Sequence, residues 1–387
     1  MTTANPRDLG LDPAKLDRLS AAVRRDIDEE RYDGAALVVG RGGAVAMQEA
    51  LGFADRATRR KARADDVFCI FSVTKQLTAA TVLARFERGE LRPTTPVADI
   101  IPEFGVKGKQ RVTVAHLLTH TGGMSAGLPP IPMDQIGNLE AAVAAICDQG
   151  VESIPGKEVS YSPITAHSVL GEIVRRVDGG KRRFRDILAA EVLEPLGMKD
   201  TWLGLRRDLA QRRVPVVVRD RSPGLFPAEL LEAFNDLITE EAEIPGAGAI
   251  STAGDIFRFA EALRRGGELD GARILSPAML GLATTNHTGL MPNNLWNYAR
   301  EMRGWDEFPA FLGLGFFLRG SGIFPMYFGT MASPRTFGGV GAGSTMFWVD
   351  PERDLTFVCL TAGLLEETRN IDRFQRLSDL LFAAVVD

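Results

Sequence analysis

The sequence has few of the residues that build disulfide frameworks or metal sites. Among 387 residues there are only three cysteines and four histidines. Cys69, Cys147 and Cys359 stand in apolar surroundings and lack the spacing that metal ligands have. This usage predicts buried thiols in a reducing compartment.

Long hydrophobic runs are also missing. The longest apolar stretches have about seven residues, whereas a helix that spans a bilayer needs about 20. Residues 1–7 lack the apolar core of a signal peptide. We therefore expect a cytoplasmic protein without a membrane partner.

No excess of one charge favours a nucleic-acid partner, since the net charge is −5 and the isoelectric point is about 5.6. Two basic runs, residues 56–63 and 175–185, carry no interleaved platform of aromatic side chains. We interpret both as solvated faces. The contents of 45% hydrophobic and 25% charged residues are those of an ordinary globular protein. Its length allows two domains, or one large domain with an insertion.

Strand patterns occur near both ends of the chain. A helix from Asp12-Pro13 to about Glu30 precedes a hairpin of two strands, Gly34–Gly40 and Ala44–Phe53. Near the other end we expect strands and a final amphipathic helix over Leu314–Leu318, Thr345–Val349, Leu355–Thr361 and Ile371–Val385.

The middle of the chain has helical periodicity with frequent proline and glycine. Helices are predicted over Val114–Leu118, Leu139–Cys147, Ile164–Val177, Arg183–Leu193, Ala253–Arg265 and Pro277–Ala283. The sequence therefore predicts an α+β fold, with an antiparallel sheet flanked by terminal helices. Residues 1–66 and 313–387 would form this discontinuous sheet domain, and residues 67–312 a large, mostly helical domain.

The segment Phe71-Ser72-Val73-Thr74-Lys75 ends an apolar run and opens a predicted helix, Val73–Glu87. Residues three apart share a helix face, so Ser72 and Lys75 point the same way. A serine hydroxyl needs a base to become a nucleophile. Lysine can be that base if burial and the helix dipole lower its pKa from about 10.4 to about 7, a change of roughly 4–5 kcal/mol. The alternative is that Ser72 is only a helix N-cap.

Tyr161 is a second candidate, because it follows the Pro155-Gly156 turn and precedes the helix that begins near Ile164. A phenol beside Ser72 and Lys75 could carry the proton to a leaving group. The alternative is a half-buried tyrosine whose hydroxyl anchors a loop.

The glycine-rich run Phe337–Gly343 directly precedes the predicted strand Thr345–Val349. Its glycines would let the backbone approach a substrate and direct an N–H group at a developing oxyanion. The alternative is a turn before an edge strand. No Gly-Lys-Ser/Thr follows, which argues against a phosphate-binding loop.

Two further patterns are rejected. Gly123-Met124-Ser125-Ala126-Gly127 matches the Gly-x-Ser-x-Gly elbow of α/β-hydrolases, but a helical segment precedes it instead of the required strand. His116 and His120 stand four residues apart, yet Leu117 replaces the glutamate of His-Glu-x-x-His and no third ligand is evident. We expect a structural role for both histidines and no metal site.

Taken together, these segments resemble the serine β-lactamase-like hydrolase family, which includes class C β-lactamases, DD-peptidases, family VIII carboxylesterases and related acyltransferases. The resemblance runs in order from about Leu9 to the end of the chain. It is carried by Ile70–Lys75, Val112–Gly123, Pro155–Ser162, Glu194–Thr201, Gly246–Asp255, Leu269–Pro277 and Gly339–Pro351.

The resemblance implies the β-lactamase/DD-peptidase fold, with the active site between the sheet and the helical domain. It implies Ser72 as the acylated nucleophile, Lys75 as its base, and Tyr161 as second base and leaving-group acid. The oxyanion hole would be the N–H groups of Ser72 and of the residue after Gly339-Val340-Gly341. That residue is Ala342, to within one position. No cofactor is implied.

Two departures from the family pattern bear on the substrate. Pro163 stands where β-lactamases and DD-peptidases have an asparagine that holds the substrate amide. Gly339 replaces the lysine or histidine that meets the substrate carboxylate. Both losses favour a neutral ester or acyl substrate. Carboxylesterases of the family often have an aromatic residue before Gly-Gly, so their pattern also differs from this one.

We therefore predict a serine carboxylesterase that acts on a small-molecule ester through an acyl-enzyme. An acyltransferase using the same intermediate is the first alternative, followed by a weak β-lactamase or amidase and by a catalytically silent binding protein. An apolar acyl pocket could be lined by aromatic residues that otherwise pack in the core, namely Phe316, Phe317, Trp305 and Phe337. The sequence leaves the oligomeric state open.

Overall fold

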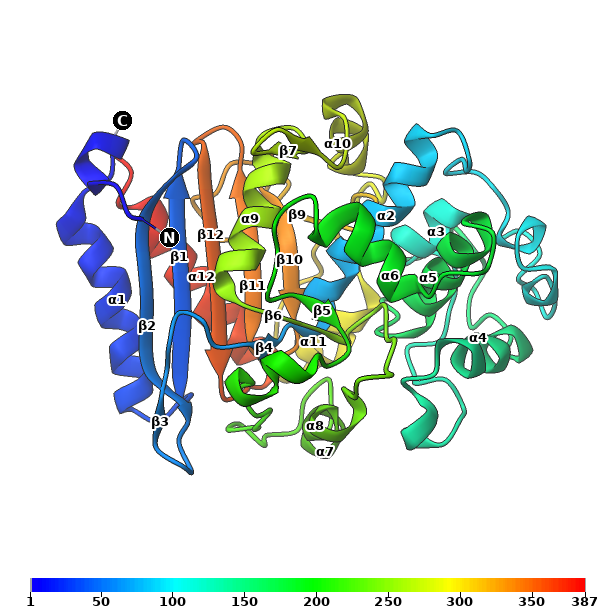
Figure 1. Cartoon of the computed structure of the whole chain (residues 1–387), viewed down its shortest axis with the longest axis horizontal. Helices are drawn as coiled ribbons and strands as arrows, with labels where there is room; N and C mark the ends of the chain where they lie inside the picture. The colour runs from blue at the N-terminus through cyan, green and yellow to red at the C-terminus, as the bar shows by residue number, and fades with distance from the viewer. Residues whose placement is uncertain (1, 387) are drawn as a thin grey trace.

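Seven strands form one antiparallel sheet in the computed structural model, which describes residues 2–386. Their order is β3-β2-β1-β12-β11-β10-β9. The strands are β1 (Gly34–Arg41), β2 (Ala44–Asp55), β3 (Arg60–Lys61), β9 (Phe317–Leu318), β10 (Phe337–Gly341), β11 (Thr345–Asp350) and β12 (Leu355–Ala362). Both ends of the chain build the sheet, and β1 lies beside β12 with Gly34 opposite Ala362 (Figure 1).

Helices cover both faces of this sheet (Figure 1). The terminal helices α1 (Pro13–Asp28) and α12 (Glu367–Phe382) pack on one face, and α9 (Ala253–Arg264) packs on the other against β11 and β12. Side chains alternate between the faces with the period of two that strands impose. On β1, Leu37 belongs to the core with the terminal helices, whereas Val38 belongs to the core with α9.

The helical region is built around α2 (Thr74–Glu87), which is buried from Thr74 to Phe86. Most residues of α2 are apolar or small, and neighbours such as α5 (Thr165–Val177) surround it. Lys75, Gln76 and Arg85 are buried polar residues of this helix. The other helices of this region are α3 (Val114–Leu118), α4 (Leu139–Asp148), α6 (Phe184–Leu188), α7 (Ala228–Glu232), α8 (Phe234–Leu237), α10 (Pro277–Ala283) and α11 (Asn297–Arg303). A second, three-stranded sheet has the order β4-β6-β5, and β7 and β8 form a hairpin. These strands are β4 (Phe68–Cys69), β5 (Trp202–Leu203), β6 (Ala249–Ser251), β7 (Glu268–Leu269) and β8 (Ala272–Arg273).

The predicted α+β fold class is confirmed, and most predicted elements are present within one or two residues. The strand predicted at Leu314–Leu318 is shorter and contains only Phe317–Leu318. The N–H groups of Leu314 and Gly315 donate instead to the carbonyls of Ala283 and Leu118, respectively. The final helix begins at Glu367 and not at Ile371, because the side chain of Glu366 caps it.

Two further elements differ from the prediction. The helix predicted at Arg183–Leu193 is α-helical only as far as Leu188 and continues as a π-helical turn, Ala189–Leu193. The glycine-rich run forms the buried strand β10 as far as Gly341 and then turns into β11, which is not an edge strand because it lies between β10 and β12. The division into two domains at residues 66 and 313 stays a prediction. Helix α9 belongs by sequence to the predicted helical domain, yet it packs on the sheet.

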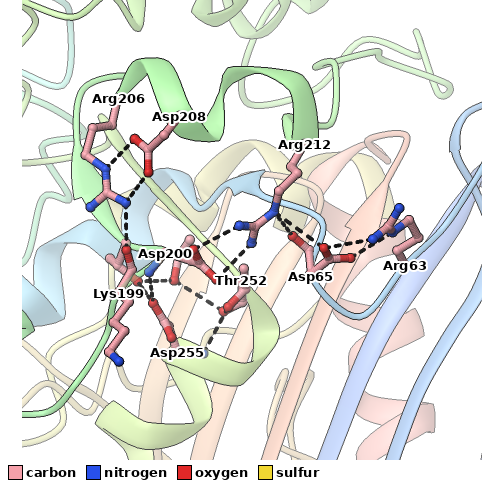
Figure 2. A network of polar contacts seen from close by, with 11 residues as sticks. Arg63, Asp65, Lys199, Asp200, Arg206, Asp208, Arg212, Thr252 and Asp255 are labelled. Atoms are coloured by element: carbon pink, nitrogen blue, oxygen red, sulfur yellow. Dashed lines mark hydrogen bonds and ion pairs between the residues drawn. The ribbon is translucent and has the colours of Figure 1, made fainter.

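A polar network holds the segment that leads toward Ser72 (Figure 2). Arg212 forms an ion pair with Asp200 at 2.8 Å and donates from Nε to the Asp65 carbonyl at 2.7 Å. The carbonyl of Arg212 accepts the N–H of Val67, the residue before β4 (Phe68–Cys69). Asp255, at the start of α9, accepts the N–H of Asp200 at 2.8 Å. These contacts hold the residues that directly precede β4 in place.

Two features that bear on partners are absent from residues 2–386. None of the helices there is long and apolar enough to cross a membrane. The same residues contain no group of three histidine, cysteine, aspartate or glutamate side chains arranged to hold a metal ion.

Candidate active site

Ser72 lies in a single 3₁₀ turn, Phe71–Val73, between β4 and α2. Phe71 has a φ of +43°, which is uncommon for a residue with a bulky side chain. Ser72 is not the N-cap of α2, because neither helix has a side-chain capping bond there. The N-cap alternative is therefore wrong. The Ser72 hydroxyl instead faces two other side chains.

Lys75 lies behind Ser72, with 1% of its surface exposed. Its Nζ is 3.0 Å from Ser72 Oγ, 2.6 Å from the Pro163 carbonyl oxygen and 2.7 Å from the Gly246 carbonyl oxygen. Within the part of the chain that the structure describes, Lys75 forms no ion pair with a carboxylate. Burial therefore lowers the pKa of the Lys75 ammonium well below its usual value.

These three contacts match the hydrogen-bonding groups of a neutral lysine. A neutral amine has two N–H groups and one lone pair. The two N–H groups can donate to the Pro163 and Gly246 carbonyls, which leaves the lone pair for the Ser72 hydroxyl. Lys75 is thus placed to accept a proton from Ser72.

Tyr161 approaches Ser72 from the other side, and its hydroxyl lies 2.7 Å from Ser72 Oγ. The Lys75 Nζ is 5.0 Å from the centre of the Tyr161 ring. Burial raises the pKa of the Tyr161 phenol, so this group stays protonated and acts as a donor in the resting state. The three residues form one hydrogen-bonded chain, in which Tyr161 donates to Ser72 and Lys75 Nζ bonds Ser72 Oγ, with Ser72 as the donor when Lys75 is neutral.

The position of Tyr161 is fixed by its neighbours. The His120 ring packs against the Tyr161 ring with centroids 4.5 Å apart. His120 Nδ1 accepts the N–H of Ser162 at 3.2 Å, and burial lowers the pKa of this histidine to about 3. Asn293 Oδ1 accepts the N–H of Tyr161 at 3.4 Å. The neutral His120 ring and Asn293 together hold the tyrosine loop.

Both histidines of the rejected metal pattern thus have structural roles, as expected. His116 closes the capping box at the start of α3, where its Nδ1 accepts the N–H of Thr113 at 3.2 Å. The rejected elbow serine, Ser125, accepts the N–H of Gly127 at 3.1 Å and has no base beside it among the described residues.

Strand β10 runs against the turn that carries Ser72, and its glycines permit this contact. An ideal Cβ on Gly341 would lie 2.3 Å from the Ile70 carbonyl oxygen. An ideal Cβ on Gly339 would lie 2.0 Å from Gln76 Oε1. The side chain of Gln76 therefore fills the space that a lysine or histidine at position 339 would need. Gln76 is held by its donation to the Gly315 carbonyl at 2.9 Å.

Ala342 follows β10 and lines the same pocket as Ser72, Tyr161 and Pro163. Pro163 enters the site through its backbone carbonyl, which binds Lys75, as well as through its ring. The structure therefore brings four of the predicted residues to one pocket, with Lys75 directly behind it. Gly339 and Gly341 lie behind the pocket, in β10.

The pocket has a volume of about 260 Å³ and mostly apolar walls. One wall comes from residues 225–234, and it includes Phe226 and Phe234. Of the four aromatic residues proposed for an acyl pocket, Phe317 lines it. Phe316 and Phe337 pack edge to face in the core, 5.6 Å apart, and Trp305 packs against Phe308.

Sequence reasoning missed several residues of this site: Gln76, Asn293, Trp296, Tyr327 and Glu367. Gln76 directly follows Lys75, so its place next to the Ser72–Lys75 motif was the signal that could have identified it. Glu367 and Tyr327 come from segments without a recognisable motif, and only the fold brings them to the pocket.

The α+β fold brings Ser72, Lys75 and Tyr161 together in one hydrogen-bonded cluster. A family model described as Beta-lactamase matches residues 19–381, and the chain therefore belongs to the β-lactamase family. The chain is a hydrolase of this family.

Three similarities place the chain within the family. Esterase/beta-lactamase LipL from Mycobacterium tuberculosis is 28% identical, over 87% of this chain and 78% of that protein. Esterase EstB from Burkholderia gladioli is 31% identical, over 68% of this chain and 74% of that protein. A crystal structure of a family VIII carboxylesterase has a TM-score of 0.80 at 24% identity, covering 97% of this chain and 99% of that one.

Proposed function

We propose that this hydrolase is a carboxylesterase that forms an acyl-enzyme on Ser72. The observation that carries the proposal is the continuous hydrogen-bonded chain from Tyr161 through Ser72 to a buried Lys75 without a carboxylate partner. A base of this kind can activate a serine hydroxyl near neutral pH. The names of the relatives LipL and EstB, both esterases, support the same substrate class.

Acylation begins when Lys75 Nζ accepts the proton of Ser72 and Ser72 Oγ attacks the carbonyl carbon of the ester. The carbonyl oxygen becomes an oxyanion in the tetrahedral intermediate. When this intermediate collapses, the carbon–oxygen bond to the alcohol breaks and Tyr161 protonates the departing oxygen. The Lys75 ammonium then returns a proton to Tyr161. Water attacks the acyl-enzyme by the same steps in reverse, which releases the acid and restores Ser72.

The geometry favours Ala342 as the second oxyanion donor. The N–H of Gly343 is bonded to Glu367 Oε2 at 2.9 Å, and the N–H of Ser344 is bonded to the Gly341 carbonyl at 3.2 Å. The N–H of Ala342 has no acceptor among the described residues. An N–H group without a protein acceptor at the pocket wall is free to bind the oxyanion.

The lining of the pocket supports a neutral substrate. Among the described residues that line it there is no lysine, arginine or histidine. A substrate carboxylate, as in β-lactams, would therefore have no cationic partner and would lie near Glu367. A neutral ester with an apolar acyl or alcohol group meets no such cost.

The test compares ester and β-lactam turnover in two serine variants. We expect the wild-type protein to hydrolyse p-nitrophenyl butyrate and to hydrolyse a chromogenic cephalosporin much more slowly. Ser72→Ala should lose at least about 10³-fold in kcat/KM, because no nucleophile remains. Ser125→Ala, the matched control in the rejected elbow, should stay within about threefold of wild type. Ester turnover that survives Ser72→Ala would contradict the proposal.

Mass spectrometry tests the intermediate itself. Rapid quenching with a slow ester should show one added acyl group on the peptide that contains Ser72, and none in Ser72→Ala. Adding an alcohol to the same reaction separates hydrolysis from acyl transfer: a transferase would give the exchanged ester in place of free acid.

A further inference from the structure

The turn that carries the proposed oxyanion donor is Gly341–Ser344, between β10 and β11. The N–H of Ser344 closes it on the Gly341 carbonyl at 3.2 Å. Gly343 has a φ of +63°, and a Cβ there would lie 2.5 Å from the Leu365 carbonyl oxygen. A four-residue turn with a positive φ at its third residue requires glycine or asparagine there. Its conformation depends on the orientation of the peptide between Ala342 and Gly343.

A buried carboxylate holds that peptide. Glu367, the first residue of α12, is 8% exposed, and its Oε2 accepts the N–H of Gly343 at 2.9 Å. Its Oε1 accepts the hydroxyl of Tyr327 at 2.6 Å and the amide of Asn370 at 3.4 Å. Glu367 and Tyr327 both line the pocket that contains Ser72. The carboxylate thus connects the pocket lining to the turn.

The same turn is held from its carbonyl side. The Gly343 carbonyl accepts the N–H of Leu365 at 3.1 Å and Arg373 Nη2 at 3.3 Å. Thr361 Oγ1 donates to the Ser344 carbonyl at 2.9 Å. The Ala342 carbonyl accepts the hydroxyl of Ser344 at 3.1 Å. Among the described atoms of the turn, these bonds occupy the other central polar groups and leave the Ala342 N–H available.

Helix capping does not explain why a buried glutamate stands at position 367. The adjacent residue, Glu366, already caps α12, because its Oε2 accepts the N–H of Thr368 at 3.0 Å. Glu366 also accepts the hydroxyl of Tyr298 at 2.7 Å. Two neighbouring glutamates thus have similar burial and similar tyrosine partners, and only Glu367 bonds the turn. Glu367 forms no ion pair among the described residues, although the charge of Arg373 interacts with this carboxylate. Burial of the carboxylate costs free energy and raises the pKa of Glu367. Such a cost is typical of functional sites.

We propose that Glu367 is a positioning residue that fixes the Gly341–Ser344 turn, so that the Ala342 N–H points at the oxyanion. The inference rests on the proposed acyl-enzyme mechanism. Without the Glu367 acceptor, the Gly343 N–H would be left unpaired in a buried place, and its peptide would rotate to find another partner. Rotation of that peptide moves Ala342 and misaligns its N–H. Removing an oxyanion donor outright costs about 10²–10³ in kcat, so misalignment should cost about 10- to 100-fold.

The experiment uses three variants of the full chain with p-nitrophenyl butyrate. We expect Glu367→Ala to lose about 10- to 100-fold in kcat/KM. Glu367→Gln should recover most of this loss, because its amide oxygen can still accept the Gly343 N–H while its NH₂ group faces Tyr327 Oη. Glu366→Ala, the matched control, should stay within about twofold of wild type. Near-ultraviolet circular dichroism establishes that each variant is folded.

Two binding measurements separate positioning from substrate contact. The dissociation constant of the intact ester, measured in the Ser72→Ala background, should change less than about threefold when Glu367→Ala is added. An alkyl boronic acid places an oxygen of its tetrahedral adduct in the oxyanion hole, so its inhibition constant should rise in parallel with the loss of kcat/KM.

Several results would overturn the inference. One is a folded Glu367→Ala with activity within twofold of wild type. Another is Glu367→Gln falling as far as Glu367→Ala, because an acceptor would then not be what matters. A third is an ester affinity that falls as much as the rate. Failure of the acyl-enzyme mechanism gives a different result, since turnover would then survive Ser72→Ala.

Discussion

Two basic side chains, Lys75 and Arg212, lie in opposite electrostatic surroundings. Lys75 is surrounded by a hydroxyl and two backbone carbonyls, and no carboxylate among the described residues pairs with it. Arg212, in the network of Figure 2, has the carboxylates of Asp200 and Asp65 within 2.8 Å and 3.7 Å. Its side chain keeps 29% of its surface exposed, whereas Lys75 keeps 1%.

The pKa values follow from these surroundings. The hydrogen bond to Asp200 raises the pKa of the Arg212 guanidinium, so its charge is permanent. Burial lowers the pKa of Lys75, so this side chain can exist without a proton. In the mechanism proposed above, Lys75 can act as a base because no carboxylate among the described residues pairs with it. A carboxylate beside Lys75 would keep it charged and remove its capacity as a base.

Replacing Lys75 by arginine should break this distinction and have the largest effect. A guanidinium does not lose its proton in proteins, so Lys75→Arg should lose about 10³-fold or more in kcat/KM with p-nitrophenyl butyrate. Lys75→Met, which removes the base without adding bulk, should be equally inactive. A Lys75→Arg protein with a tenth of wild-type activity would contradict the role of Lys75 as base.

The pH profile of the wild-type protein belongs to the same prediction. A base works when deprotonated, so activity should rise with pH through the lowered pKa of Lys75 and fall as pH drops below it. The rise should therefore be complete well below the usual lysine pKa of about 10.4. Any residual activity of Lys75→Met should lack this rise. A wild-type profile that still climbs near pH 10 would show an ordinary, charged lysine.

Substitution of Gly339 tests the packing behind the lysine and should have a smaller effect. In Gly339→Ala the new methyl group meets Gln76 Oε1, which must move. Gln76 also contacts Gly315, so the movement should disturb α2 one residue from Lys75 and lower kcat/KM by about 10-fold. Gln76→Ala combined with Gly339→Ala should restore part of this loss. Equal activity of Gly339→Ala and wild type would show that Gln76 moves away freely.

Removing Arg212 should have the smallest effect. Partly exposed ion pairs contribute about 0–1 kcal/mol, so Arg212→Gln should lower Tm by about 1–2 °C and change kcat/KM less than twofold. The difference in Tm should shrink in 0.5 M NaCl because salt screens surface charge. A large loss of activity at unchanged Tm would mean that the network acts on the site directly.

Sequence reasoning reached the reactive side chains of the site but not their surroundings. Ser72, Lys75 and Tyr161 stand in short motifs whose residue types carry the chemistry. The two acceptors of Lys75 are backbone carbonyls, at Pro163 and Gly246, and a carbonyl has no residue-type signal. From the sequence, Pro163 indicates only the absence of an amide donor. In the structure this residue still contributes its backbone carbonyl, which binds Lys75.

The fold was predictable where periodicity is strong and not where tertiary contacts decide. The hairpin of β1 and β2 and the helices α1, α2 and α9 follow from apolar spacing and caps. The glycine-rich strand β10 has too few side chains to show a pattern, and only its pairing with β11 and β9 makes it a strand. Glu367 was missed because the first turn of α12 presents polar residues that are buried by their partners.

The pairing of β1 with β12 also has a consequence for how the chain folds. Gly34 must find Ala362 across nearly the whole sequence, and closing so long a loop costs on the order of 5 kcal/mol in chain entropy. Contacts of this separation form late, since nothing offsets their entropy until much of the chain is compact. The turn with Ala342 and the helix with Glu367 flank this last pairing. We expect refolding to give native helical content first and esterase activity only in the slowest phase.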